Sequence, residues 1–187
     1  MNINYIDFLD NKYKAKSKIK KIYNTSFPKS EKFPFWILKK SLKSKNVNLY
    51  GILYNNKIIG MQYILHYNNE AYLMYFAIDE KYRNIGYGSI LIKNITKRYH
   101  NVILSIERVV DKVSKRRKNF YIRNGFNETG KFTIQNNIHY EILCSNNNYN
   151  LTKDKLINLY SQMSKSKILR YIMNKRFNLM NIDFIEN

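Results

Sequence analysis

The sequence is poor in cysteine, proline and glycine: it has one, two and six of them in 187 residues. The single cysteine, Cys144, excludes an internal disulfide and is typical of a protein in a reducing cytoplasm. It lies in an apolar run, so we predict a buried thiol and not a nucleophile. No apolar run approaches the ~18 residues of a membrane span, and the first ten residues lack the pattern of a signal peptide. We therefore expect a cytoplasmic protein without a membrane span.

Acidic residues are also scarce: 13 Asp and Glu stand against 33 Lys and Arg, which gives a formal net charge of +20. This balance favours anionic partners such as nucleic acid, acidic lipids or a phosphorylated cofactor. A surface of solvated lysines is the alternative. The three histidines, His66, His100 and His139, show no metal-ligand spacing with each other or with Cys144. We predict no metal site.

Hydrophobic residues make up 44% of the chain, and their spacing predicts an α+β fold. Short polar turns between the apolar runs of the first half are typical of antiparallel hairpins. In chain order, we expect helices at 11–24 and 37–44, strands at 47–54, 57–67 and 71–78, a helix at 89–99, a strand at 101–107, a helix at 112–124, and paired strands at 131–134 and 138–143. Both prolines lie in the aromatic turn from Phe27 to Trp36.

The expected elements form one domain over residues 1–145, with a mixed, mostly antiparallel sheet flanked by helices. Residues 146–187 are expected to be a helical extension that packs on the same domain. Thr152 is placed to cap its first helix, with Leu156, Leu159, Tyr160 and Met163 on the apolar side. A further basic helix is expected over 165–177. The sequence leaves open whether the protein is a monomer or a homodimer.

The turn between Ile78 and Ser89 carries the most chemical information. A buried strand runs into a loop with Arg83, Gly86 and Gly88 and then into a helix. Glycines let the backbone come close to a bulky anion, and the free N–H groups of a helix's first turn attract it. An ordinary strand-to-helix turn is one alternative. A dinucleotide fingerprint is another, but Leu91 stands where its third glycine belongs and the hairpin strands before it do not form the required βαβ unit.

A second motif, Phe120-Tyr121-x-x-x-Gly125-Phe126, stands about thirty residues beyond Ser89. Together with Arg83-x-x-Gly86-x-Gly88 it resembles the two motifs of the GCN5-related N-acetyltransferases (GNAT), of the bacterial type. The resemblance covers roughly residues 18–143, and the segment 27–35 is similar to one in some bacterial members. It implies a GNAT-like fold, acetyl-CoA as co-substrate and direct acetyl transfer to an amine acceptor.

The resemblance also implies roles for single residues. The Phe76 N–H would polarise the thioester carbonyl, Tyr121 would protonate the leaving thiolate, and Glu107 is the candidate base for the amine. Glu31, Glu141 and the Tyr72 hydroxyl are weaker candidates. The cofactor-binding residues would be Ile78, Arg83, Asn84, Ile85, Gly86, Tyr87, Gly88, Ser89, Ser114 and Arg117.

Three positions depart from the family pattern: Ser114 replaces a common asparagine, Arg117 a small residue and Met74 an often acidic one. They bear on the acceptor chemistry more than on the cofactor. The acceptor class stays open between a small amine, a peptide N-terminus and a lysine, although the net charge favours a neutral or acidic acceptor. A second hypothesis is a basic nucleic-acid-binding module on an acetyltransferase-like fold with weak or no catalysis, supported by the charge and the basic segment 165–176.

Overall fold

The computed structural model describes residues 3–10, 13–135 and 137–164, together with residues 170, 171, 175 and 184. The elements are, in chain order, β1 (Ile3–Asp7), α1 (Tyr13–Ser26), α2 (Phe35–Ser41), β2 (Val47–Tyr54), β3 (Lys57–Tyr67), β4 (Glu70–Ile78), the 3₁₀ turn η1 (Glu80–Tyr82), α3 (Tyr87–Arg98), β5 (Asn101–Glu107), α4 (Lys112–Arg123), β6 (Asn127–Gln135), β7 (Ile138–Cys144) and α5 (Lys153–Ser161). Within these described ranges, no helix is long and apolar enough to cross a membrane.

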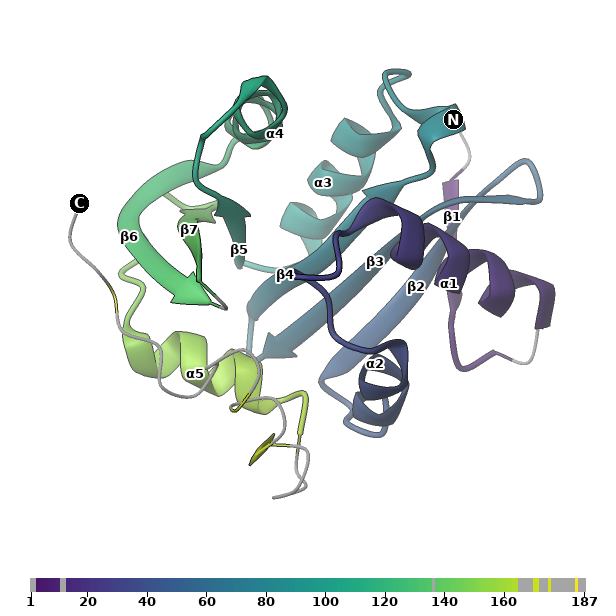
Figure 1. Ribbon diagram of the computed structural model, residues 1–187, viewed down its shortest axis with the longest axis horizontal. Helices are drawn as coiled ribbons and strands as arrows, with labels where there is room; N and C mark the ends of the chain where they lie inside the picture. The colour runs from purple at the N-terminus through teal and green to yellow at the C-terminus, as the bar shows by residue number, and fades with distance from the viewer. Residues whose placement is uncertain are drawn as a thin grey trace.

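The strands form one sheet in the order β1-β2-β3-β4-β5-β7-β6 (Figure 1). All neighbours pair antiparallel except β4 and β5, which are parallel. The parallel pairing covers only three residue pairs, from Glu70↔Asn101 to Tyr72↔Ile103. Beyond Tyr72 and Ile103 the described parts of the two strands share no further pair, so they diverge in the middle of the sheet.

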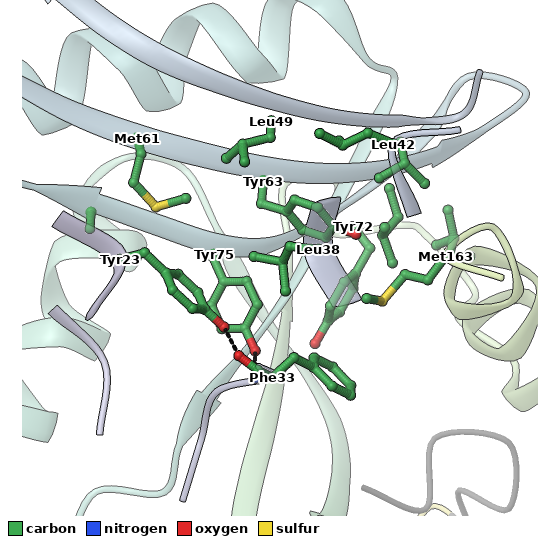
Figure 2. Packing of buried hydrophobic residues seen from close by; sticks show 14 of the residues in the cluster. Tyr23, Phe33, Leu38, Leu42, Leu49, Met61, Tyr63, Tyr72, Tyr75 and Met163 are labelled. Carbon is green, nitrogen blue, oxygen red and sulfur yellow. Dashed lines mark hydrogen bonds between the residues drawn. The ribbon is translucent and has the colours of Figure 1, made fainter. Parts of the chain in front are cut away.

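Helices cover both faces of this sheet (Figure 1). On one face, α1, α2 and α5 bury side chains such as Ile19, Leu38 and Leu159 in the largest hydrophobic cluster. On the other face, α3 and α4 bury Ile92 and Tyr121 in a second cluster. Figure 2 shows the aromatic centre of the first cluster, where tyrosines from α1, β3 and β4 lie between aliphatic side chains.

The predicted fold class is confirmed, and β2, β3 and β5 begin and end at the predicted residues. The strand β1 was not predicted, because its five residues alternate weakly and it pairs only at the edge of the sheet. Strand β6 begins at Asn127, four residues before the predicted start, and its pairing with β7 is irregular between Glu128 and Phe132. Thr152 caps α5 as predicted. The helix predicted over 165–177 lies outside the described residues, apart from 170, 171 and 175.

Candidate active site

A cavity of about 580 Å³ opens where β4 and β5 diverge. Its walls come from both strands, from the turn that leads into α3, from α4, and from the loop between α1 and α2. The last residues of β6 and the middle of β7 close it through Gln135 and Tyr140. Both sequence motifs therefore face one cavity, although they are separate in the sequence.

A bulge in β4 shapes one wall of this cavity. Tyr75 lies opposite Tyr63 of β3 and Leu73 lies opposite Ile64, so Met74 has no partner in the register. A bulge bends its strand and locally ends regular pairing, which helps β4 to turn away from β5.

The bulge also sets which backbone groups face the cavity. The Asp79 N–H donates to the Ile59 carbonyl of β3 at 2.8 Å. Backbone groups of successive residues in a strand point to opposite sides. Phe76 and Ile78, at odd spacing from Asp79, therefore direct their N–H and C=O groups away from β3 and toward the gap beside β5. This is the side on which the sequence resemblance places the thioester and the pantetheine arm.

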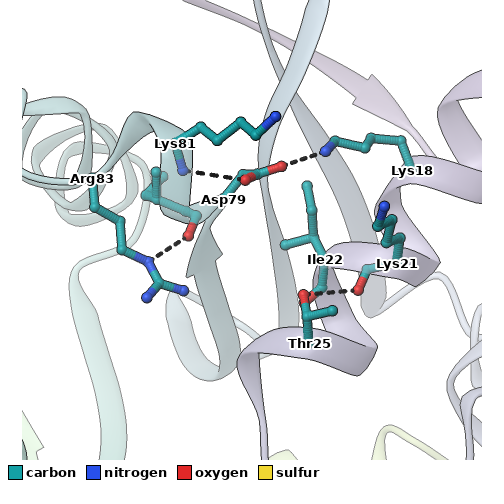
Figure 3. A network of polar contacts seen from close by, with 8 residues as sticks. Lys18, Lys21, Ile22, Thr25, Asp79, Lys81 and Arg83 are labelled. Carbon is teal, nitrogen blue, oxygen red and sulfur yellow. Dashed lines mark hydrogen bonds and ion pairs between the residues drawn. The ribbon is translucent and has the colours of Figure 1, made fainter.

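Polar contacts fix the chain just after β4 (Figure 3). The Asp79 carboxylate caps η1 by accepting from the Lys81 N–H at 3.3 Å, and it pairs with Lys18 of α1. The hydrogen bond from Lys18 holds the pKa of Asp79 below its ordinary value. Arg83 donates from Nε to the Ile78 carbonyl at 3.0 Å. The turn thus leaves β4 in a defined direction, and Arg83 is tied to the strand.

The glycine turn presents backbone amides to the cavity. Gly86 is the N-cap of α3 with φ of 90°, and Asn84 also has a positive φ of 63°. The first hydrogen bond of the helix runs from the Ile90 N–H to the Gly86 carbonyl at 3.3 Å. The amides of Tyr87, Gly88 and Ser89 precede it, in the turn where a helix has no backbone acceptors of its own. Together with the helix dipole, these free N–H groups give the turn the geometry by which helix N-termini attract anions such as phosphate.

The second glycine has a packing role that the sequence did not reveal. A Cβ added to Gly88 would lie 3.1 Å from Cζ and 3.2 Å from Cε2 of Phe120 on α4. The two motifs are therefore in direct contact, because the ring of one rests on the glycine of the other. At Gly86 an added Cβ would meet nothing within 4 Å, so there the positive φ is what requires glycine.

Tyr121 is almost fully buried on the cavity wall. Its ring packs against Phe120 and Phe126 at centroid distances of 5.1 and 5.6 Å. Burial raises the pKa of Tyr121 to about 12, with the positive charge of Arg117 acting in the opposite direction. The phenol therefore carries its proton throughout the neutral range, as a proton donor must.

Two carboxylates line the part of the cavity that lies between β5 and the loop joining α1 to α2. Glu107 ends β5, and its Oε2 lies 3.9 Å from Nη1 of Arg117. Glu31 comes from the loop, and burial raises its pKa, while the charge of Arg117 lowers it and that of Glu107 raises it further. The charges of these three side chains therefore interact across the cavity.

Other predicted site residues lie elsewhere. Ser114 forms a capping box with Asp111 at the start of α4 and is not part of the cavity wall, so its cofactor role stays a prediction. Ile85 and Tyr87 also do not line the cavity: Ile85 is exposed and Tyr87 is buried in a third hydrophobic cluster, which leaves only their amides for an anion. Glu141 is buried and pairs with Lys118 at 2.8 Å, outside the cavity.

Known proteins share the domain type and the fold of this chain. Residues 45–128 match the family model described as the acetyltransferase (GNAT) domain. No curated protein sequence matches the chain. Among solved structures, a protein from Bacteroides thetaiotaomicron assigned to the GNAT family aligns with a TM-score of 0.67 and 20% identity, over 93% of this chain and 97% of that chain.

Two further solved structures are similar and hold ligands. Arabidopsis thaliana Naa50, in complex with the bisubstrate analogue CoA-Ac-MVNAL, aligns with a TM-score of 0.58 and 18% identity, over 78% of this chain and 99% of that chain. A GNAT family acetyltransferase from Elizabethkingia anophelis with acetyl-CoA bound aligns with a TM-score of 0.51 and 18% identity, over 76% of this chain and 97% of that chain. The matched segment contains both motifs, and the fold around it is the one these proteins share. Residues 45–128 thus match the GNAT acetyltransferase domain model, and the chain shares the fold of these acetyltransferases.

Proposed function

We propose that the protein is an N-acetyltransferase that moves an acetyl group directly from acetyl-CoA to an amine. The observation that carries the proposal is the cavity in which the diverging strands, the amides of the α3 turn and Tyr121 meet. A thioester with a long pantetheine arm and a pyrophosphate fits this arrangement. The arm would lie in the gap between β4 and β5, and the pyrophosphate would bind the amides at 85–89.

The backbone of β4 would act on the thioester. The Phe76 N–H faces the gap and would donate to the carbonyl oxygen as negative charge develops there. Ile78 would pair its backbone with the pantetheine amides. In the described structure the Ile78 carbonyl accepts from Arg83. Binding of the arm would therefore compete with this contact and free the guanidinium to meet a phosphate.

Tyr121 would complete the transfer as the general acid. When the C–S bond breaks, the leaving thiolate takes a proton from the phenol. The raised pKa of Tyr121 keeps that proton in place until the thiolate forms. The base that takes the proton from the amine would be one of the two carboxylates that line the cavity, Glu107 and Glu31.

The C-terminal extension belongs to the same domain in this proposal. Helix α5 buries Leu156, Leu159 and Tyr160 in the cluster that α1 and α2 also fill. Tyr160 packs edge-on against Tyr72 at a centroid distance of 4.8 Å, and Tyr72 lines the cavity. The extension would thus support one wall of the site.

A thiol-release assay tests the function, with acetyl-CoA and a panel of spermidine, glucosamine and a short peptide with a free N-terminus. We expect Tyr121→Phe to lower turnover by roughly 100-fold or more and to leave acetyl-CoA binding unchanged. Tyr99→Phe is the matched control, because Tyr99 is equally buried but lies off the cavity. Equal turnover by Tyr121→Phe would remove the phenol from the mechanism. Wild-type protein that neither binds acetyl-CoA nor releases thiol, but shifts RNA at low salt, would favour the basic binding module.

A further inference from the structure

An acceptor amine enters the site as an ammonium ion at neutral pH, and it must lose a proton before it can attack. Which side chain takes this proton is a question that rests on the proposed acetyl transfer. Of the side chains that line the cavity, two are carboxylates: Glu31 and Glu107. They come from different parts of the fold and have different surroundings, which allows their roles to be separated.

Glu107 lies near the positively charged side chain of Arg117. Its carboxylate faces Arg117 of α4 at 3.9 Å, and about a third of its side chain is exposed. At this distance the opposite charges attract each other, so the guanidinium helps to hold the carboxylate in position. Glu107 is therefore well placed to orient Arg117 and the incoming ammonium.

Glu31 is held over the cavity by the buried core. The Tyr75 hydroxyl donates to the Glu31 carbonyl and accepts from the Phe33 N–H, both at 3.1 Å. The Tyr23 hydroxyl donates to the Phe33 carbonyl at 2.8 Å. Figure 2 shows how the hydroxyl groups of Tyr23 and Tyr75 converge on Phe33. Two buried tyrosines thus fix the backbone that carries Glu31.

We infer that Glu31 is the catalytic base that takes the proton from the acceptor ammonium, with Glu107 and Arg117 as positioning residues beside it. Partial burial of Glu31 supports this role, because desolvation and the neighbouring Glu107 raise its pKa toward the working range. Its other titratable neighbours are Arg117 on α4, Tyr75 on β4 and Tyr140 on β7. Burial raises the pKa of both tyrosines, so they stay neutral.

Every proton of the reaction is accounted for when Glu31 acts as the base and Tyr121 as the acid. Glu31 takes one proton from the ammonium, and the neutral amine attacks the thioester carbon. The C–N bond forms, the oxyanion faces the Phe76 N–H, and the C–S bond then breaks. The thiolate takes the Tyr121 proton, and the second amine proton restores the Tyr121 phenol through water. Glu31 finally gives its proton to solvent, so acetyl-CoA and an ammonium yield an amide, CoA thiol and one proton.

The first test compares Glu31→Gln with Glu107→Gln in the full chain, with the best acceptor of the panel above. We expect Glu31→Gln to lower kcat/KM by roughly 100-fold or more, with acetyl-CoA affinity within about twofold. In the wild type kcat/KM should fall as pH drops below the raised pKa of Glu31, and Glu31→Gln should lose this acid limb while Glu107→Gln keeps it. An acid limb that survives in Glu31→Gln, or that disappears in Glu107→Gln, would overturn the assignment.

The second test needs no acceptor. Carbon-13 NMR of the glutamate carboxyls in the full chain identifies the Glu31 signal as the one missing from Glu31→Gln. We expect this signal to titrate above the ordinary glutamate pKa of ~4.3, and titration at or below that value contradicts the inference. Failure of the proposed function itself would appear differently, as wild-type protein that does not bind acetyl-CoA.

Discussion

The two ends of the cavity are built in different ways. The end proposed for the cofactor has backbone groups from one continuous stretch, Phe76 to Ser89, in which a bulged strand, a turn and a helix follow one another. The end proposed for the acceptor has side chains from four separate segments: Glu31 from the loop after α1, Glu107 from β5, Arg117 from α4 and Tyr140 from β7. A ligand shared by a family can be recognised by a local backbone motif, whereas the selectivity for an acceptor depends on how distant segments assemble.

This difference predicts that substitutions at the two ends affect different constants. Substitutions of buried residues that support the wall of the acceptor end should alter stability and the KM of the amine. Changes in the turn should alter the affinity for acetyl-CoA. An ion pair beside the turn but outside the cavity should have a small effect on stability and none on selectivity.

The largest effect is expected from Tyr160→Ala behind the acceptor end. Tyr160 of α5 is fully buried, packs on Tyr72 and accepts a hydrogen bond from Gln135 at 3.3 Å. Loss of such a ring costs about 3–5 kcal/mol of unfolding free energy, measured by urea denaturation. Tyr67→Ala, at an exposed strand end, should change stability by less than about 0.5 kcal/mol.

The milder Tyr160→Phe keeps the ring and removes only the hydroxyl. We expect a raised acceptor KM and an unchanged acetyl-CoA affinity, because Tyr72 and Gln135 line the cavity and Tyr160 contacts both. A changed acetyl-CoA affinity with an unchanged acceptor KM would contradict the claim that the two ends of the cavity act on different constants.

A smaller effect is expected from Gly88→Ala at the cofactor end. The new methyl group would meet Phe120 at 3.1 Å and push α4 slightly away from the turn. We expect a loss of about 1 kcal/mol in stability and an acetyl-CoA affinity lower by about fivefold. Calorimetry measures the affinity, and the double variant with Phe120→Leu should recover part of it. If the effects of the two substitutions on affinity simply add, the contact between residue 88 and Phe120 is not the cause of the lower acetyl-CoA affinity.

The smallest effect is expected from Lys18→Met, which removes the partner of Asp79 between α1 and the end of β4. The pair is partly exposed, so its loss should cost less than about 1 kcal/mol. Because Lys18 lowers the pKa of Asp79, this stabilisation is fully present above the unfolded Asp pKa of ~3.9 and disappears as pH falls through the lower folded pKa. Urea denaturation at several pH values measures the difference, and a cost that persists at the acid end would contradict this cause.

The same contrast explains what could be predicted from the sequence. Strand β3 and the glycine turn were predictable, since period, polar turns and glycine spacing are local signals. The bulge at Met74 and the contact between Gly88 and Phe120 were not, because they depend on register and on packing between motifs. The aromatic turn was noted in the sequence, but only the fold shows that Tyr75 anchors it and brings Glu31 to the cavity.

The central claim is that the turn before α3 binds acetyl-CoA, and calorimetric titration tests it most directly. Gly86→Glu places a negative charge and a side chain at a residue with φ of 90°, while Gly130→Glu applies the same change at φ of 68° away from the cavity. We predict micromolar binding by the wild type and by Gly130→Glu, and none by Gly86→Glu. A folded wild-type protein that does not bind acetyl-CoA, or equal binding by Gly86→Glu, would contradict the account.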